Sequence, residues 1–263
     1  MKTIGLIGTG NIGSAIVRSL APRSLFTILL NDINQERSLA LAEETGSRSV
    51  SLDHLLSEAD LLVLAVKPQV LPSLYGRLSQ AKDKDWISTA AGISLATLGK
   101  NLRSASVARI MPNIAASVGK SFTALAFSPQ ASESFKREAE TLVTSFGQVF
   151  HLDENLFSAF TALSGSAIAT VFQFLNGLAL AGVREGFTYE SALRIVSATC
   201  LSAVGVLEES GLHPEALVNQ VCSPAGTAIE SMVLLENRCF KGTLIDSVHA
   251  ACLRSKELEV GSD

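Results

Sequence analysis

The chain has 263 residues, a length typical of one large domain or two modest ones. Hydrophobic residues make up 47% and charged residues 17%, so we expect a substantial core and exclude extensive disorder. The net charge is −4 and no basic tract occurs, which argues against a nucleic-acid partner. An anionic ligand must therefore be held by backbone amides and helix ends.

The first part of the chain alternates short apolar runs with helical patterns. Strands are predicted at Thr3–Ile7, Phe26–Leu30, Leu61–Val66, Trp86–Ser88, Val107–Ile110, Phe122–Phe127 and Gln148–Leu152. The clearest helices between them are Asn11–Leu20, Asn34–Glu44 and Ser132–Phe146. This alternation predicts an α/β fold: an N-terminal Rossmann-type, doubly wound and mostly parallel sheet with helices on both faces.

After Asp153 only helical periodicity remains. We therefore expect a dinucleotide-binding domain at 1–152 and an all-α domain at 153–263. The stretch from Asn155 to Val183 carries no charge and is long enough to span a bilayer. Its polar, glycine and alanine residues favour instead a helix buried at a subunit interface, and we predict no membrane partner.

The cysteines and histidines predict neither disulfides nor a metal site. All four cysteines lie in the last third without a C-x-x-C pair, and the four histidines are scattered. Such cysteines are typical of reduced thiols in a reducing compartment. Because the chain opens on a strand rather than on a signal peptide, we expect a cytoplasmic protein.

A phosphate-binding turn is predicted directly after the first strand, at Gly8-Thr9-Gly10-Asn11-Ile12-Gly13. It matches G-x-G-x-x-G between a strand and a helix, which is the context this pattern requires. The first glycine permits the turn, the second lets a pyrophosphate approach, and the third lets helix and strand pack closely. The helix N-terminus adds oriented N–H groups for the phosphates.

Asp32 follows the second strand, where a carboxylate accepts the ribose hydroxyls of NAD and repels the 2′-phosphate of NADP. Asn31 and Arg37 could instead help to hold a phosphate, and Asp32 could simply cap the next helix. The balance leans slightly to NAD, but the cofactor remains NADPH or NADH.

Three further motifs follow strands, at the sheet edge where ligands bind. They are Ala65-Val66-Lys67-Pro68-Gln69, Thr89-Ala90-Ala91-Gly92-Ile93 and Arg109-Ile110-Met111-Pro112-Asn113. The helical half adds Leu163-Ser164-Gly165-Ser166 and Ser223-Pro224-Ala225-Gly226-Thr227, and closes with Ala250-Ala251-Cys252-Leu253-Arg254-Ser255-Lys256-Glu257-Leu258. In order and spacing, over essentially the whole chain, these motifs resemble pyrroline-5-carboxylate reductases.

The resemblance implies NAD(P)H-dependent reduction of the C=N bond of 1-pyrroline-5-carboxylate, a cyclic imino acid, to L-proline. It implies a helical substrate and dimerisation domain that interlocks with a second subunit, in a homodimer or higher homo-oligomer. Besides the glycine turn, the implied cofactor contacts are Ala65, Val66, Lys67, Pro68, Thr89, Ala90 and Ala91. The implied substrate contacts are Ser164, Gly165, Ser166, Ser223, Pro224, Ala225, Gly226, Thr227 and Ala228, with Thr227 the catalytic candidate.

The presumed substrate pocket departs from the family pattern. Ala167-Ile168-Ala169-Thr170 stands where the family has Gly-Pro-Ala-Tyr, Ala225 replaces a glycine, and Ala228 replaces the second threonine of the turn. Loss of one positioned donor costs roughly 10²–10³ in rate when that donor stabilises developing charge. A different cyclic imine as substrate, or reduced activity, therefore stays open.

Two other functions remain as alternatives. A β-hydroxyacid dehydrogenase has a related fold but needs a lysine base on the long helix, and no lysine occurs between Asn155 and Val183. A non-catalytic, dinucleotide-sensing regulator would explain Ala167 and Ala228. Cofactor binding without turnover would distinguish this regulator from an enzyme.

Overall fold

The computed structural model describes residues 2–260, which form two compact units. Of these residues, one unit contains 2–165 together with 251–260, and the other contains Ser166–Ala250. The first holds the sheet and the second is helical. Each unit is described separately.

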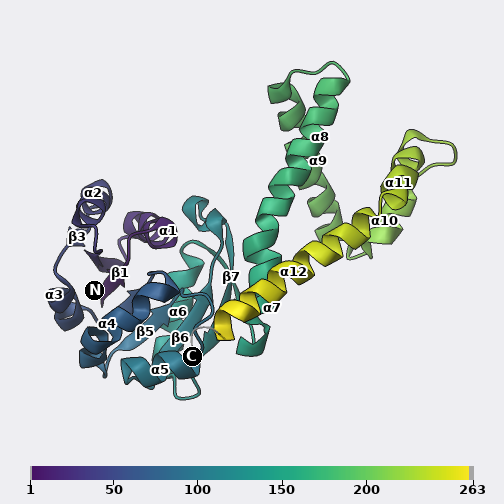
Figure 1. Ribbon diagram of the computed structural model, residues 1–263. Coiled ribbons are helices and arrows are strands. Elements are labelled where there is room, and N and C mark those ends of the chain that lie inside the picture. Colours follow the sequence, from purple (N-terminus) through teal and green to yellow (C-terminus); the bar gives the residue numbers. More distant parts are fainter. Residues whose placement is uncertain (1, 261–263) are drawn as a thin grey trace. The chain divides into compact units, whose positions relative to one another are not determined.

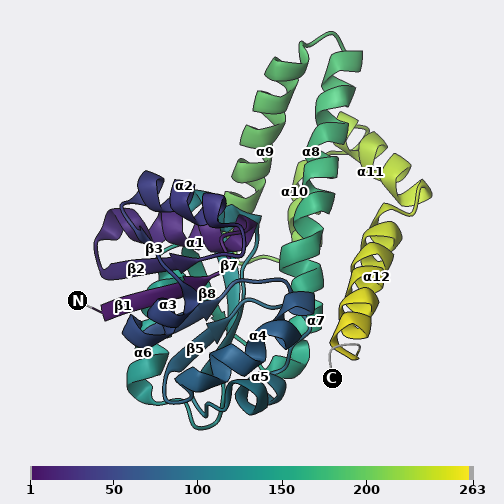
Figure 2. The same ribbon diagram turned by 60° about the vertical axis from the view of Figure 1, so that its left-hand side comes forward.

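The first unit is built on one eight-stranded sheet, in the order β3-β2-β1-β4-β5-β6-β7-β8 (Figures 1 and 2). All neighbouring strands are parallel except β6 and β7, which confirms the predicted fold class. The seven predicted strands all form, and sequence analysis missed only β3, which has two residues. The strands are β1 Lys2–Ile7, β2 Phe26–Asn31, β3 Arg48–Ser49, β4 Leu61–Leu64, β5 Asp85–Ser88, β6 Val107–Met111, β7 Ser121–Phe127 and β8 Gly147–His151.

Helices connect the strands and cover both faces of the sheet. They are α1 Asn11–Leu20, α2 Gln35–Thr45, α3 Leu52–Glu58, α4 Leu71–Leu78, α5 Leu95–Leu102, α6 Glu133–Thr144 and the short α7 Phe157–Phe160. Several begin at a side chain that caps the first turn. The Ser51 hydroxyl accepts from the His54 amide, and Ser94 and Ser132 cap α5 and α6 in the same way. Such caps satisfy amides that have no partner within the helix.

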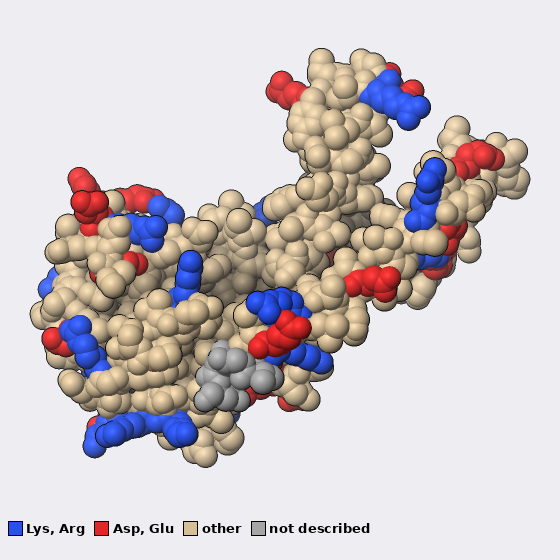
Figure 3. Space-filling model, viewed as in Figure 1, with Lys and Arg blue, Asp and Glu red and all other residues tan. Residues whose placement is uncertain are grey.

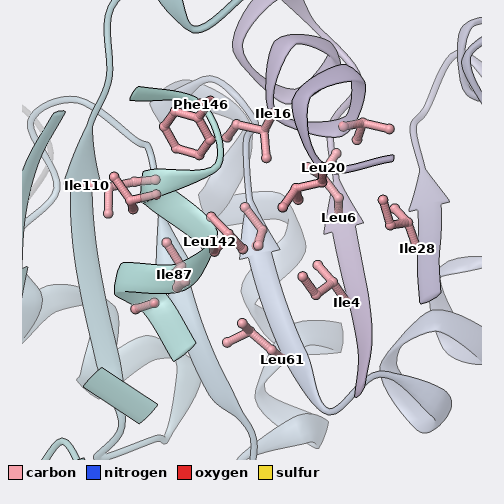
Figure 4. Close-up of a cluster of buried hydrophobic side chains, with 14 of the residues drawn as sticks. Ile4, Leu6, Ile16, Leu20, Ile28, Leu61, Ile87, Ile110, Leu142 and Phe146 are labelled. Carbon is pink, nitrogen blue, oxygen red and sulfur yellow. The ribbon is translucent and has the colours of Figure 1, made fainter. Parts of the chain in front are cut away.

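The core lies in two layers, one on each side of the sheet. Ile4 and Leu6 of β1 point to the layer that includes residues of α1 and α6, which Figure 4 shows. Ile7 belongs to the other layer, with α3, α4 and α5. This alternation follows from the two-residue period of a strand. Gly5 is needed on that second side, since a Cβ there would lie 2.5 Å from the Leu55 side chain.

The second unit contains α8 Ala167–Arg184, α9 Tyr189–Ser210, α10 Pro214–Val221, α11 Thr227–Asn237 and the first part of α12 Phe240–Val260. Helices α8 and α9 lie side by side in both ribbon views (Figures 1 and 2). They approach closely at Gly182, where a Cβ would lie 2.8 Å from that of Ala192.

Most of this helical unit is exposed in a single chain. Figure 3 shows few charged residues along α8 and α9 except near the end where they join. The helical stretches Glu154–Arg184 and Tyr189–Ser210 are long and apolar enough to cross a membrane, a test that core helices of soluble proteins also pass. Only 6% of each apolar stretch is buried in the single chain. Exposed apolar side chains include Val171, Phe172, Phe174, Leu178, Leu180, Val183, Leu201, Val204 and Val206.

Candidate dinucleotide cleft and substrate turn

The glycine turn has the geometry that close backbone packing requires. Gly8 has a φ of +99°, and a Cβ there would lie 2.7 Å from the Ala65 carbonyl oxygen. A Cβ on Gly13 would lie 2.0 Å from the Gly8 carbonyl oxygen. By contrast, no atom lies within 4 Å of a Cβ built on Gly10. The first and third glycines therefore close the turn, while the second leaves room for a ligand beside the backbone.

A cavity of about 580 Å³ opens beside this turn. Its position follows from the sheet order, because β1 pairs with β2 on one side and β4 on the other, and the chain reverses its direction of winding there. Seven of the predicted cofactor residues line it: Gly8, Gly10, Asn31, Asp32, Ala65, Val66 and Lys67. The others do not: Thr9, Asn11, Ile12, Gly13, Pro68, Thr89, Ala90 and Ala91.

Sequence analysis missed part of the cavity wall. Four of the missed residues, Val70, Ser73, Leu74 and Arg77, recur at the spacing of one helix face. That spacing would have identified these four residues as one face if a helix had been predicted after Pro68. Ser51 and Leu52 also line the cavity and follow the two-residue β3, which has too little pattern to detect.

Asp32 is fixed by three hydrogen bonds at the mouth of the turn. One carboxylate oxygen accepts from the Thr9 amide at 2.6 Å and the Thr9 hydroxyl at 2.9 Å. The other accepts from the Asn34 amide at 2.9 Å. Burial alone would raise the pKa of Asp32, but these hydrogen bonds and the charge of Arg37 lower it below its ordinary value. The carboxylate is therefore ionised at neutral pH and held in place.

The predicted substrate turn lies in the helical unit and leads into α11. The Gly226 amide donates to the Ser223 carbonyl at 3.0 Å and closes the turn. A Cβ on Gly226 would lie 2.4 Å from the Ser223 hydroxyl oxygen. No side chain caps the first amides of α11, and Thr227 is exposed at its first turn. Free amides at a helix start suit a small carboxylate.

Comparison with known proteins identifies the family. Residues 154–258 match the family model for pyrroline-5-carboxylate reductase dimerisation, and residues 3–92 match the model for NADP oxidoreductase, coenzyme F420-dependent. Pyrroline-5-carboxylate reductases from Aquifex aeolicus and Methanosarcina acetivorans are each 35% identical to the chain. The matches cover 97% of both chains for the first and 98% of both for the second. The chain belongs to the pyrroline-5-carboxylate reductase family.

A solved structure agrees with this assignment. The 1-pyrroline-5-carboxylate reductase of Streptococcus pyogenes superposes with a TM-score of 0.90 at 32% identity, covering 97% of this chain and 98% of that one. The dimerisation model spans α8 and α9, so their exposed apolar side chains are those expected of a subunit interface. This accounts for the two apolar helices without a membrane.

One family departure has a visible backbone cost. Ala225, which replaces a glycine of the reductase motif, has a φ of +56°. An L-residue in this left-handed region costs roughly 1–2 kcal/mol, whereas glycine adopts it freely. The turn nevertheless keeps its closing hydrogen bond between Gly226 and Ser223.

The motif from Arg109 to Asn113 begins with a buried arginine that forms two ion pairs. The Arg109 guanidinium is 3% exposed and donates to Glu154 at 3.0 Å and to Glu259 at 2.9 Å. It also lies 4.6 Å from the ring centre of Phe157. Arg109 therefore joins the sheet to the end of α12 through two ion pairs in which its own side chain is buried.

Asn113 supports the predicted Ser-Gly-Ser segment. Its amide nitrogen donates to the Ser164 hydroxyl at 3.1 Å, and that hydroxyl donates to the Phe122 carbonyl at 3.1 Å. Thr161–Ser166 form a π-helix, a form that occurs often at functional sites. The Ser164 hydroxyl is thus engaged within the fold, whereas Ser166 is exposed.

The remaining predicted contacts stabilise the loop after β5. The Thr89 amide donates to the Leu64 carbonyl at 2.9 Å, and Ala90 is 1% exposed within the core. Gly92 has a φ of +76°, and a Cβ there would lie 3.0 Å from the Leu258 carbonyl oxygen. No group of three His, Cys, Asp or Glu side chains within residues 2–260 could hold a metal ion.

Proposed function

We propose that this reductase transfers hydride from NADH or NADPH to the C=N bond of 1-pyrroline-5-carboxylate and forms L-proline. The main support is the glycine turn at Gly8–Gly13. Among its three glycines only Gly10 has open space beside it, and this space adjoins a cavity large enough for part of a dinucleotide. Similarity over 97% of the chain to enzymes named for this reaction supports the substrate.

The residues of the cleft fit a nicotinamide dinucleotide. The turn at Gly8–Gly13 and the start of α1 present backbone amides to a pyrophosphate. When bound, the cofactor supplies the hydride and so the redox chemistry. The protein then acts mainly by holding two reactants in position, which suits an iminium that is already electrophilic.

We propose that the substrate carboxylate binds the amides at the start of α11, within Ser223–Ala228. Thr227 is the residue of this turn that retains a hydroxyl at a family threonine position, and we assign it the contact with the reacting imine. We propose Ser164, Gly165 and Ser166 as further substrate contacts. In this proposal Ala228 supplies no hydrogen bond.

The same proposal covers organisation and location. Residues 1–152 bind the dinucleotide, and residues 153–263 bind substrate and pair with a second copy of the chain. The homodimer buries the apolar faces of α8 and α9. We propose that the enzyme is soluble and cytoplasmic, which fractionation of the source cells would test.

Steady-state oxidation of NADH and NADPH, with a panel of cyclic imino acids, tests the activity. The variant Gly10→Ala places a methyl group where the pyrophosphate must approach and should lower kcat/KM for the cofactor by about tenfold or more. Its folding should be unaffected, because no protein atom lies within 4 Å of the added carbon.

Gly76→Ala is the matched control. Gly76 on α4 also has open space around a built Cβ, but it does not line the cavity. Its kcat/KM should equal that of the unmodified enzyme. Absence of imine-dependent oxidation of both cofactors by the unmodified protein would refute the proposed activity.

The substrate turn is tested by Thr227→Val and Ala228→Thr. Thr227→Val removes the hydroxyl at similar volume and should lower kcat for the imine, with little change in KM for the cofactor. Ala228→Thr restores the family residue and should raise kcat/KM for the imine. If neither variant changes imine kinetics, the turn is not the substrate site.

A further inference from the structure

We propose that Asp32 makes this enzyme prefer NADH over NADPH, because the carboxylate occupies the donors that a 2′-phosphate would need. This inference rests on the proposed function of the cleft and adds the choice between its two cofactors. The sequence alone left that choice open between Asp32, Asn31 and Arg37.

The first argument concerns the donors beside the cleft. The Thr9 amide, the Thr9 hydroxyl and the Asn34 amide converge on the Asp32 carboxylate at 2.6, 2.9 and 2.9 Å. In another arrangement these three groups could bind a phosphate. Here they are already satisfied by an anion of the chain itself.

The carboxylate still has room for a ribose hydroxyl. A carboxylate offers about four acceptor positions, and three are used. Asp32 lines the cavity, so the remaining position can accept a hydroxyl donor of the adenosine ribose. A 2′-phosphate has no such donor when ionised and carries about −1.5 to −2 charges at neutral pH, so it would face a fixed like charge.

The cations that line the cavity do not remove this repulsion. Arg77 is paired with Asp53 at 2.7 Å. The positive charge of Arg37 lowers the pKa of Asp32 by less than each of the three hydrogen bonds does, so it offsets only part of the carboxylate's charge. Lys67 lies in the loop after β4, on the far side of β1 from β2 in the sheet order. The side-chain amide of Asn31 donates to the Val50 carbonyl at 2.9 Å, so this donor is engaged with the backbone.

The test compares kcat/KM for NADH and NADPH in the unmodified enzyme, Asp32→Ser and Thr9→Ala. The unmodified enzyme should favour NADH by at least about tenfold, since a carboxylate and a phosphate in contact repel strongly at a partly buried site. Asp32→Ser removes the charge and adds a donor, and should lower that ratio by about tenfold or more. Thr9→Ala frees one hydrogen bond of the carboxylate and should lower the ratio by a smaller factor.

The ratio is the decisive quantity, because a general disturbance of the turn weakens both cofactors alike. Asp83→Asn is the matched control: it removes one negative charge from an exposed site of the same unit, outside the cavity. Its ratio should equal that of the unmodified enzyme.

Binding of NAD⁺ and NADP⁺ by calorimetry separates this inference from the proposed activity. An enzyme without imine turnover that still binds NAD⁺ more tightly would refute the activity but not the role of Asp32. Equal or tighter binding of NADP⁺ by the unmodified protein would overturn the inference. So would an unchanged ratio in Asp32→Ser.

Discussion

Replacing the buried Arg109 should destabilise the sheet-containing unit. Its guanidinium makes two charge-assisted hydrogen bonds, to Glu154 and Glu259, and each such bond contributes about 1.5–3 kcal/mol. The two carboxylates are 30% and 33% exposed, so water compensates part of the loss. Arg109 Nε is buried without a partner, which further reduces the net contribution. We expect Arg109→Met to lower the free energy of unfolding by about 2–4 kcal/mol.

Urea unfolding at fixed protein concentration measures this difference, because a dimer's stability depends on concentration. Trp86 is the chain's single tryptophan and is fully buried in the same unit, so its fluorescence reports the transition. The control is Arg137→Met on the exposed side of α6, where we expect less than about 0.5 kcal/mol. If Arg109→Met were as stable as the control, the ion pairs of Arg109 with Glu154 and Glu259 would contribute nothing to the free energy of unfolding, and the prediction would be wrong.

Three further changes test the turns. Gly13→Ala places a Cβ 2.0 Å from the Gly8 carbonyl oxygen, so we expect the free energy of unfolding to fall by about 1–3 kcal/mol. We also expect the variant to lose the rise in melting temperature that NADH causes, and an unchanged rise would contradict the packing role of Gly13. Because folding lowers the pKa of Asp32, the ionised carboxylate stabilises the fold at pH values above the pKa of an unfolded aspartate. The greater free energy of unfolding of the unmodified protein over Asp32→Asn should therefore be lost as pH falls below about 4, and a difference in stability that persists at pH 2 would contradict this role. Ala225→Gly relieves the positive φ, which costs roughly 1–2 kcal/mol, but it also stabilises the unfolded chain by roughly 0.4–1 kcal/mol of conformational entropy. The net gain in denaturant unfolding should therefore be up to about 1 kcal/mol, whereas a clear loss would show that Ala225 is unstrained.

Local sequence patterns determined much of the first unit. The strands form where apolar residues run continuously, because both faces of a parallel sheet are buried. The turn at Gly8–Gly13 could be predicted from the sequence, because its glycines are required by contacts between residues close in sequence or on adjacent strands. The direction of β7 did not follow from its pattern, because parallel and antiparallel strands with the same burial look alike.

The cavity wall and the charge partners needed the tertiary structure. Asp32 has the same neighbours in sequence whether it caps a helix or binds a ribose, and only folding brings Thr9 to its carboxylate. Glu259 lies 150 positions from Arg109, so no local pattern could pair them. The sequence by itself therefore determined the strands, the glycine turn and the family. The tertiary structure decided which charges are buried and which donors are already engaged, because those properties depend on contacts between residues far apart in the chain.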